Sequence, residues 1–130
     1  MAKILVLDDS LDILEGVKYI LDMEGHESIT VSNKRDLEAQ LIISHPDLII
    51  MDVLLGGHDG RQICKELKSD EKTKHIPIIL MSASPGVLKE YKLCEANDTI
   101  GKPFHLKDFT HKVDKVLKLL PIIISYLSLK

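Results

Sequence analysis

The sequence predicts an α/β domain in which helices cover both faces of a doubly wound, five-stranded parallel sheet. Five short apolar runs alternate with segments whose apolar residues recur at helical spacing. Strands that are buried on both faces appear as nearly continuous apolar runs, and right-handed helical crossovers join them. The 130 residues are enough for one domain with a substantial hydrophobic core.

The first half of the chain is expected to contain three strands and two helices. We place the strands at residues 3–7, 27–31 and 48–51. Ser10 is a candidate N-cap of the first helix and Gly25 ends it, while Ser32 or Asn33 caps the second, which ends before Pro46. The apolar stripes of these two helices comprise Leu11, Leu14, Val17, Ile20, Leu21, Leu37, Leu41 and Ile42.

The second half is expected to contain three helices and two strands. A helix from Arg61 is followed by strands at residues 76–81 and 99–100, with a short fourth helix from Pro85 between them. The third helix should direct Lys65, Glu66 and Lys68 outward. The apolar stripes of these helices comprise Ile63, Cys64, Leu67, Leu88, Tyr91, Leu93, Leu106, Phe109, Val113, Val116, Leu117 and Leu120.

Composition excludes several classes of function. Seventeen basic and twenty acidic residues give a net charge of −3, and five aromatic residues offer little base stacking, so we expect no nucleic-acid partner. The sequence shows no secretory signal and no apolar run long enough to span a bilayer. We therefore expect a cytoplasmic protein without a membrane partner. Cys64 and Cys94 are expected to be reduced thiols, and a disulfide or a metal site is the alternative.

The end of the chain is unusually apolar. Residues 1–120 are expected to form the domain, and residues 121–130 an apolar C-terminal tail without an output domain. Pro121 is expected to interrupt or kink the last helix. The tail either folds back on the domain or contacts a partner or a second copy, because apolar patches of this size often mark contacts.

Chemically active residues follow the predicted strands. Asp8 and Asp9 end the first strand, Asp52 ends the third, Ser82 ends the fourth, and Lys102 follows the fifth. Because the carboxyl ends of parallel strands meet at one edge, these residues should converge where such sheets bind ligands. Three carboxylates repel one another unless a cation neutralises them, and Mg²⁺ prefers oxygen ligands. With a hydroxyl and a lysine added, the group could hold a phosphoryl group and offer one carboxylate as nucleophile.

These motifs resemble the receiver domain of two-component response regulators over about residues 2 to 119. The matching segments are Ile4–Ser10, Met51-Asp52 followed by Asp59-Gly60, Pro77–Ala83 and Lys102-Pro103-Phe104. The resemblance implies a flavodoxin-like sheet of strand order 2-1-3-4-5. It also implies a phosphoacceptor domain that catalyses at most its own phosphotransfer and autodephosphorylation.

The resemblance assigns roles to particular residues. Asp52 would accept phosphate from a histidine kinase or phosphotransfer protein. Mg²⁺ would be held by Asp8, Asp9, Asp52 and the backbone carbonyl of Leu54. Ser82 and Lys102 would bind the phosphoryl oxygens, and the Lys102-Pro103 peptide bond would be cis. Phosphorylation would then rearrange the face around the fourth helix and fifth strand and alter contacts with an unidentified output protein.

The sequence departs from the family pattern at the expected output face. The switch would couple Ser82 to the position three residues before the lysine, which is usually Tyr or Phe but here is Thr99. The segment from Ser82 to Lys102 is about two residues shorter than usual, so a short or irregular fourth helix is expected. Gly56 stands where proline is common, and Leu54 offers nothing to orient an attacking water. A homodimer would use the fourth helix, fifth strand, fifth helix or C-terminal tail.

Two other functions fit parts of the pattern. An aspartyl-phosphate hydrolase of the haloacid-dehalogenase type uses the same chemical groups. Its nucleophilic aspartate, however, ends the first strand, where this chain has the acidic pair. A pseudo-receiver that binds partners without phosphate is favoured by Thr99 but opposed by the presence of all five site residues.

Overall fold

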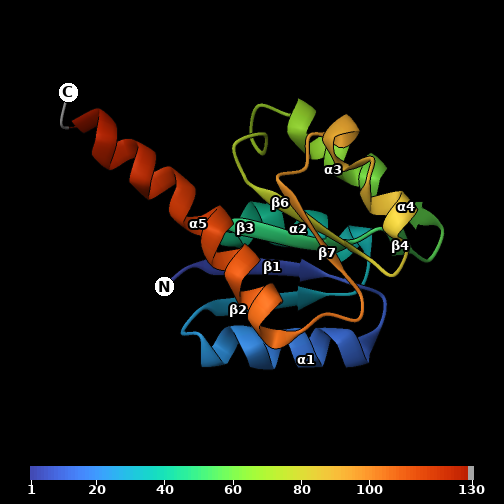
Figure 1. Ribbon diagram of the computed structural model, residues 1–130. Helices are drawn as coiled ribbons and strands as arrows, with labels where there is room; N and C mark the ends of the chain where they lie inside the picture. The colour runs from blue at the N-terminus through green and yellow to red at the C-terminus, as the bar shows by residue number, and fades with distance from the viewer. Residues whose placement is uncertain (129–130) are drawn as a thin grey trace.

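The computed structural model describes the backbone of residues 1–128 and the side chains of residues 1–117. Its central sheet has five parallel strands, β1 (Lys3–Leu7), β2 (Glu27–Val31), β3 (Leu48–Asp52), β6 (Ile78–Ser82) and β7 (Asp98–Gly101). Their order in the sheet is β2-β1-β3-β6-β7 (Figure 1). The predicted doubly wound, flavodoxin-like arrangement of order 2-1-3-4-5 is therefore confirmed.

Helices bury both faces of the sheet and create two separate hydrophobic cores. On one face α1 (Leu11–Met23) and α5 (Leu106–Ser128) pack on the sheet through residues such as Val17 and Phe109. The other face is covered by α2 (Lys34–Ser44), α3 (Gly60–Ser69), α4 (Pro85–Leu88) and the 3-10 turn η1 (Tyr91–Cys94). The strands lie between these two layers, which explains why β1, β3 and β6 are almost wholly apolar.

Side-chain caps set where the first two helices begin. The hydroxyl of Ser10 accepts a hydrogen bond from the backbone N–H of Ile13 at 3.4 Å. At the second helix, Asn33 Oδ1 accepts from the N–H of Asp36 at 2.8 Å. Asn33 rather than Ser32 is therefore the N-cap, which decides between the two residues that the sequence left open.

Several residues lie differently from their predicted faces. Four apolar residues assigned to helical stripes are exposed, namely Leu11, Ile42, Leu93 and Leu106. They lie near helix ends or within the irregular segment after β6. Helical spacing identifies the inner face but not how far the sheet beneath it extends.

Lys68 was predicted to point outward into solvent, but in the structure it is half-buried. Its Nζ donates to the backbone carbonyl of Ile76 at 2.8 Å and to Asn97 Oδ1 at 3.0 Å. Burial lowers the pKa of Lys68, although nearby Cys64 and Glu95 act in the other direction. The lysine thus joins the end of α3 to the loops that enter β6 and β7.

The glycine-rich loop after β3 contains an antiparallel hairpin that the sequence did not predict. Strands β4 (Leu54–Leu55) and β5 (His58–Asp59) pair across Gly56 and Gly57. Both glycines have positive φ, at +23° and +89°, so two residues can reverse the chain.

The last two helices differ greatly in length. α4 is a single turn followed by η1, which confirms the expected short and irregular fourth helix. α5 is one helix that continues through Pro121, so the helix is not interrupted there, and the alternative of a kink stays a prediction. The side chains of the predicted tail at 121–130 lie outside the described residues. No helix among the residues that the structure describes is long and apolar enough to cross a membrane.

Candidate functional site

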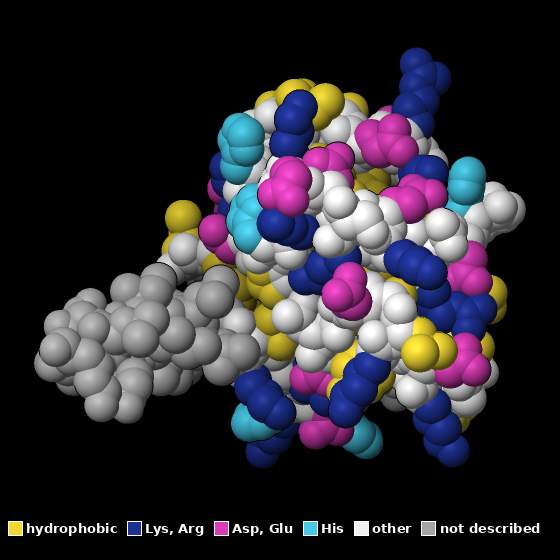
Figure 2. Space-filling model, turned by 90° about the horizontal axis from the view of Figure 1, so that it is seen from above, with side chains coloured by type: hydrophobic (Ala, Val, Ile, Leu, Met, Phe, Trp, Pro, Cys, Tyr) yellow, Lys and Arg dark blue, Asp and Glu magenta, His cyan; other side chains and the backbone are white. Residues whose placement is uncertain are grey.

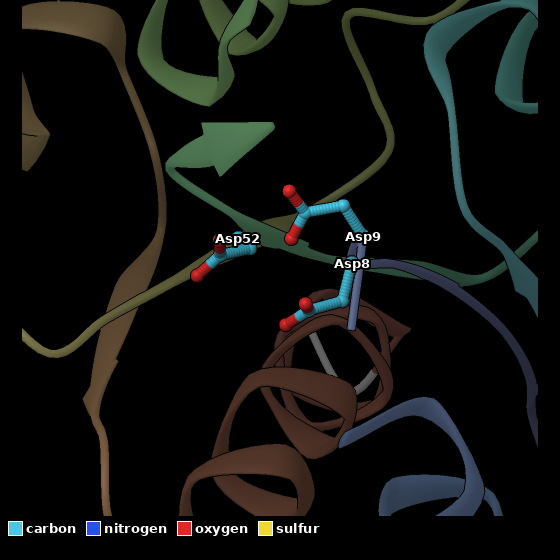
Figure 3. A group of neighbouring side chains, drawn as sticks. All are labelled: Asp8, Asp9 and Asp52. Carbon is cyan, nitrogen blue, oxygen red and sulfur yellow. The ribbon is translucent and has the colours of Figure 1, made fainter. Parts of the chain in front are cut away.

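Parallel pairing of β1 with β3 brings three aspartates together at the carboxyl edge of the sheet. Leu7 is the partner of Met51, so Asp8 and Asp52 occupy the next register position on adjacent strands. One carboxylate oxygen from each of Asp8, Asp9 and Asp52 lies within 4.8 Å of the others. Figure 3 shows Asp8 and Asp9 extending from the end of β1 toward Asp52.

Lys102 reaches this group from the loop after β7. Its Nζ lies 2.6 Å from Asp8 Oδ2 and 3.0 Å from Asp52 Oδ1. The backbone N–H of Lys102 donates to the carbonyl of Ser82 at 2.8 Å, which fixes the start of the loop against the end of β6. The Lys102-Pro103 peptide bond is cis.

Burial of the site residues makes their charged forms less favourable than they are in water. The side chains of Asp8, Asp52 and Lys102 are 1%, 9% and 16% exposed, while Asp9 is exposed. Desolvation raises the pKa of Asp52, and the charges of Asp8 and Asp9 raise it further against the opposing effect of Lys102. Burial lowers the pKa of Lys102, but its bonds to Asp8 and Asp52 more than compensate, so the pKa lies above its usual range.

This arrangement fits a divalent cation. Three carboxylates converge on one side and a single ammonium faces two of them, so the group retains excess negative charge when all three are ionised. The donors are carboxylate oxygens, and one of the three residues is open to solvent, which leaves room for water ligands. Mg²⁺ has this preference, since it binds through one or two carboxylates and keeps several waters.

Ser82 and Leu54 lie at the same edge as the aspartates. Ser82 is buried at the end of β6, and its Oγ accepts a hydrogen bond from the N–H of Ser84 at 3.0 Å. The hydroxyl hydrogen therefore remains available as a donor. Leu54 follows β3 in the hairpin, with its side chain 70% exposed.

Thr99 lies away from this group, within β7. It pairs with Leu80 in the sheet and is partly exposed. Its carbonyl accepts a hydrogen bond from Lys112 of α5. The structure thus brings Asp8, Asp9, Asp52 and Lys102 close together and places Ser82 and Leu54 at the same edge. Thr99 is connected instead to α5.

Gly60 supports the site in a way that sequence reasoning missed. Its N–H donates to the carbonyl of Val53 at 2.7 Å, and a Cβ at this position would overlap the carbonyl oxygen of Asp52. Only glycine lets α3 approach the backbone that carries Asp52 so closely. The Asp59-Gly60 pair was among the segments that match the receiver-domain pattern, and it could have pointed to this close approach of the backbone.

Asp59 and Arg61 form a second local cluster that the sequence analysis did not identify. Asp59 caps α3 through the N–H of Arg61 and also binds its guanidinium, with Nη2 at 2.7 Å from Oδ2. Hydrogen bonds from Arg61 hold the pKa of the Asp59 carboxyl below its usual range. Arg61 also contacts Glu90 at 3.3 Å, which connects the site loop with the segment after α4.

Comparisons of the sequence and of the fold with known proteins point to the same family. The model of the response regulator receiver domain matches residues 4–114. The phosphate regulon transcriptional regulatory protein PhoB of Pseudomonas aeruginosa is 33% identical over 117 residues, covering 88% of this chain and 51% of that protein. The chain spans about half the length of the curated relatives it matches.

Solved structures agree with the sequence comparison. The chemotaxis response regulator CheY4 of Vibrio cholerae has a TM-score of 0.82 at 29% identity, over 90% of this chain and 99% of its own. NtrX of Brucella abortus has a TM-score of 0.88 at 27% identity, over 99% of this chain and 30% of its own. Together with the family match and the fold, these similarities show that the chain belongs to the response regulator receiver domain family.

Proposed function

We propose that this chain is a phosphorylation-switched signalling module in which Asp52 accepts a phosphoryl group from a histidine kinase or phosphotransfer protein. The observation that carries the proposal is the contact of Lys102 with both Asp8 and Asp52 inside a group of three carboxylates. Asp8, Asp9, Asp52 and the backbone carbonyl of Leu54 would hold Mg²⁺. The bound ion would neutralise charge on the carboxylates and on the phosphoryl oxygens.

The transfer itself needs one nucleophile and two groups that bind oxygen. A carboxylate oxygen of Asp52 attacks phosphorus, and the bond from phosphorus to the donor's leaving atom breaks, so the electron pair leaves with the donor. Lys102 is already within hydrogen-bond distance of Asp52 and can follow the new negative charge onto the phosphoryl group. The Ser82 hydroxyl can donate to a phosphoryl oxygen while still accepting from Ser84.

Readout would go through protein contacts. The charges on the face shown in Figure 2 are mixed, and basic side chains do not form a continuous surface there among the described residues. Nucleic-acid binding would require such a surface. A movement of Ser82 toward the phosphoryl group would displace β6 and the adjacent β7. Because the carbonyl of Thr99 in β7 accepts a hydrogen bond from Lys112, this displacement would also shift α5. The output protein, or a second copy bound through α4, β7 or α5, would recognise the altered face.

The first test is the intact mass of the protein after incubation with Mg²⁺ and acetyl phosphate. We expect a phosphoryl adduct on the wild type and none on Asp52→Asn. Asp47→Asn is the matched control, because Asp47 lies at the opposite edge of the sheet and binds the N–H of Lys3.

The result distinguishes the two surviving functions. An adduct on both the wild type and Asp47→Asn supports phosphoacceptance at Asp52. An adduct that persists in Asp52→Asn would place the acceptor elsewhere. If no protein gains mass although Mg²⁺ binding is demonstrated, the phosphate-independent partner module, which Thr99 favours, replaces the proposal.

A further inference from the structure

A cavity lies between the ends of α2 and α3, which are neighbours in the layer over one face of the sheet (Figure 1). Its volume is about 850 Å³, within the range of about 300–1,000 Å³ that is typical of ligand pockets. Pro46 and Pro77, which precede β3 and β6, are part of its lining. Because Asp52 and Ser82 lie at the other ends of these strands, the cavity is at the opposite edge of the sheet from the aspartates.

The cavity contains apolar surface that the core leaves uncovered. Leu41 of α2 and Leu67 of α3 are only partly buried against the core, and both line the cavity. Ile42 lines it as well, although its side chain is 77% exposed. Helical spacing predicted Ile42 to lie in the core, so packing within the chain does not account for this residue. A partner that covered it would gain the free energy of removing its apolar surface from water.

Acidic side chains outnumber basic ones around this apolar surface. The lining contains one lysine, Lys72, and four carboxylates, those of Glu38, Asp47, Glu66 and Asp70. Lys34 lies outside the lining, 3.9 Å from Glu38 and 3.3 Å from Glu66, and it neutralises part of their charge. Even when Lys34 is counted with Lys72, two carboxylates remain in excess over the ammonium groups. The cavity is therefore complementary to a ligand that is both apolar and positively charged.

The shape and chemistry of the lining favour a segment of polypeptide as this ligand. An anion would be repelled by the excess carboxylates. A metal ion is not favoured either, because the one cluster of three or more metal-ligating side chains among the described residues is that of the three aspartates at the other edge. The part of α2 that lines the cavity, from Glu38 to His45, is about 10 Å long at 1.5 Å per residue. This length matches about three residues of extended chain.

We propose that this cavity binds a short segment of a partner protein in which an apolar side chain is next to a lysine or arginine. The apolar side chain would contact Leu41, Ile42 and Leu67. The cation would pair with Asp70, whose Oδ1 accepts the N–H of Lys72 at 2.9 Å and whose Oδ2 is left for the ligand. Binding at this edge does not rest on phosphorylation at the other, so the proposal stands or falls separately from the proposed function.

Three peptides separate the contributions of charge and apolar surface. The probe is an acetylated and amidated tetrapeptide of sequence Lys-Leu-Leu-Lys, and the comparison peptides are Glu-Leu-Leu-Glu and Lys-Ser-Ser-Lys. Methyl NMR spectra of the full chain, labelled at Ile, Leu and Val, measure binding at pH 8, where imidazole groups such as His45 and His75 of the lining add little positive charge. We expect the probe to shift the signals of Leu41, Ile42 and Leu67. The other two peptides should bind at least about tenfold more weakly.

α2 offers a matched pair of variants at adjacent positions. Ile42 and Ile43 are 77% and 72% exposed, but of the two only Ile42 lines the cavity. Ile42→Ser should weaken binding of the probe by about tenfold, whereas Ile43→Ser should leave it unchanged. Asp70→Asn can still cap its turn but lacks the charge. It should weaken binding by about two- to fivefold and make it less sensitive to salt.

Several outcomes would overturn the proposal. They are the absence of methyl shifts at millimolar probe, equal affinity for the three peptides, and equal effects of the two serine variants. Shifts of the same signals by phenethylamine but not by the probe would show that the cavity takes a small organic cation instead. Cavity signals that change with protein concentration alone would show that a second copy of the chain occupies it.

Discussion

Asp52 combines burial, two neighbouring carboxylates and a lysine in one position. Its raised pKa means that the ionised form is less favourable in the folded protein than in the unfolded chain, mainly because of desolvation. The contribution of Asp52 to folding stability is therefore largest below the ordinary aspartate pKa of 3.8 and is lost as pH rises through the pKa of the folded state. At neutral pH, where Asp52 of the unfolded chain is ionised, the raised pKa of this residue therefore destabilises the folded protein when no cation is bound.

Replacing this charge should stabilise the protein without Mg²⁺. In EDTA at neutral pH, Asp52→Asn should unfold at a higher temperature than the wild type, because it removes a buried charge while Lys102 keeps its 2.6 Å contact with Asp8. Added Mg²⁺ should reverse the order by stabilising the wild type by about 2.7 kcal/mol at one hundred times its dissociation constant. Thermal unfolding with and without Mg²⁺ measures both effects. An equal response of the two proteins to Mg²⁺ would exclude Asp52 as a ligand.

At the scale of elements, the site depends on how closely α3 approaches the end of β3. The hairpin β4–β5 returns the chain to Gly60 within a few residues, and Asp59 caps the helix that begins there. The absence of a side chain at Gly60 allows the carbonyl of Asp52 to lie against the first turn of α3. The position of the Asp52 carboxylate is thus coupled to the packing of this helix.

A single methyl group at Gly60 should disturb this contact. Gly60→Ala forces the backbone after Asp52 to shift and should lower the free energy of unfolding by about 1–3 kcal/mol or more. The acetyl phosphate reaction should slow as well. Gly86→Ala in α4 is the control, because the added Cβ meets nothing within 4 Å and φ is not positive, so stability should stay equal or rise slightly. Denaturant unfolding and intact mass provide the two readouts, and equal stability of both variants would contradict the assigned contact.

At the scale of the whole molecule, one sheet separates two hydrophobic cores. Cys64 and Cys94 are free and buried in the core under α2, α3 and η1. Phe109 is buried in the opposite core, where it stacks on Phe104 with ring centroids 4.9 Å apart. Burial raises the pKa of Cys64, and neighbouring Cys94 raises it further, so the Cys64 thiol should be unreactive while the fold is intact. Cys94 is buried as well, which shields its sulfur from reagents in solution.

These thiols can report whether the two cores unfold together. Phe109→Ala should lower the free energy of unfolding by about 3–5 kcal/mol. Because β1, β3 and β6 belong to both cores, the variant should also speed the reaction of Cys64 and Cys94 with a thiol reagent on the far side of the sheet. The rate of thiol modification without denaturant measures this. An unchanged rate in a destabilised variant would show that the two layers open independently.

The strands of the central sheet and the residues at their carboxyl ends could be identified from the sequence alone. Apolar runs and helical spacing identified all five sheet strands, because period and burial are local properties of the chain. The strand ends named Asp8, Asp9, Asp52, Ser82 and Lys102 as one group, since parallel strands share a carboxyl edge. In the structure Lys102 contacts Asp8 and Asp52, an oxygen of Asp9 lies within 4.8 Å of theirs, and Ser82 lies at the same edge.

Contacts between elements that are remote in the sequence could not be predicted, because they depend on how those elements pack. Lys68 was expected in solvent, yet it is half-buried because the loops before β6 and β7 meet over it. Ile42 was expected inside, yet it is exposed, although Leu37 and Ser44 of the same helix are buried. The hairpin after Leu54 and the approach of Gly60 to Asp52 require backbone geometry, which periodicity does not encode. Local pattern specifies which face is apolar and which residues end a strand, whereas register and packing between remote segments decide what each residue touches.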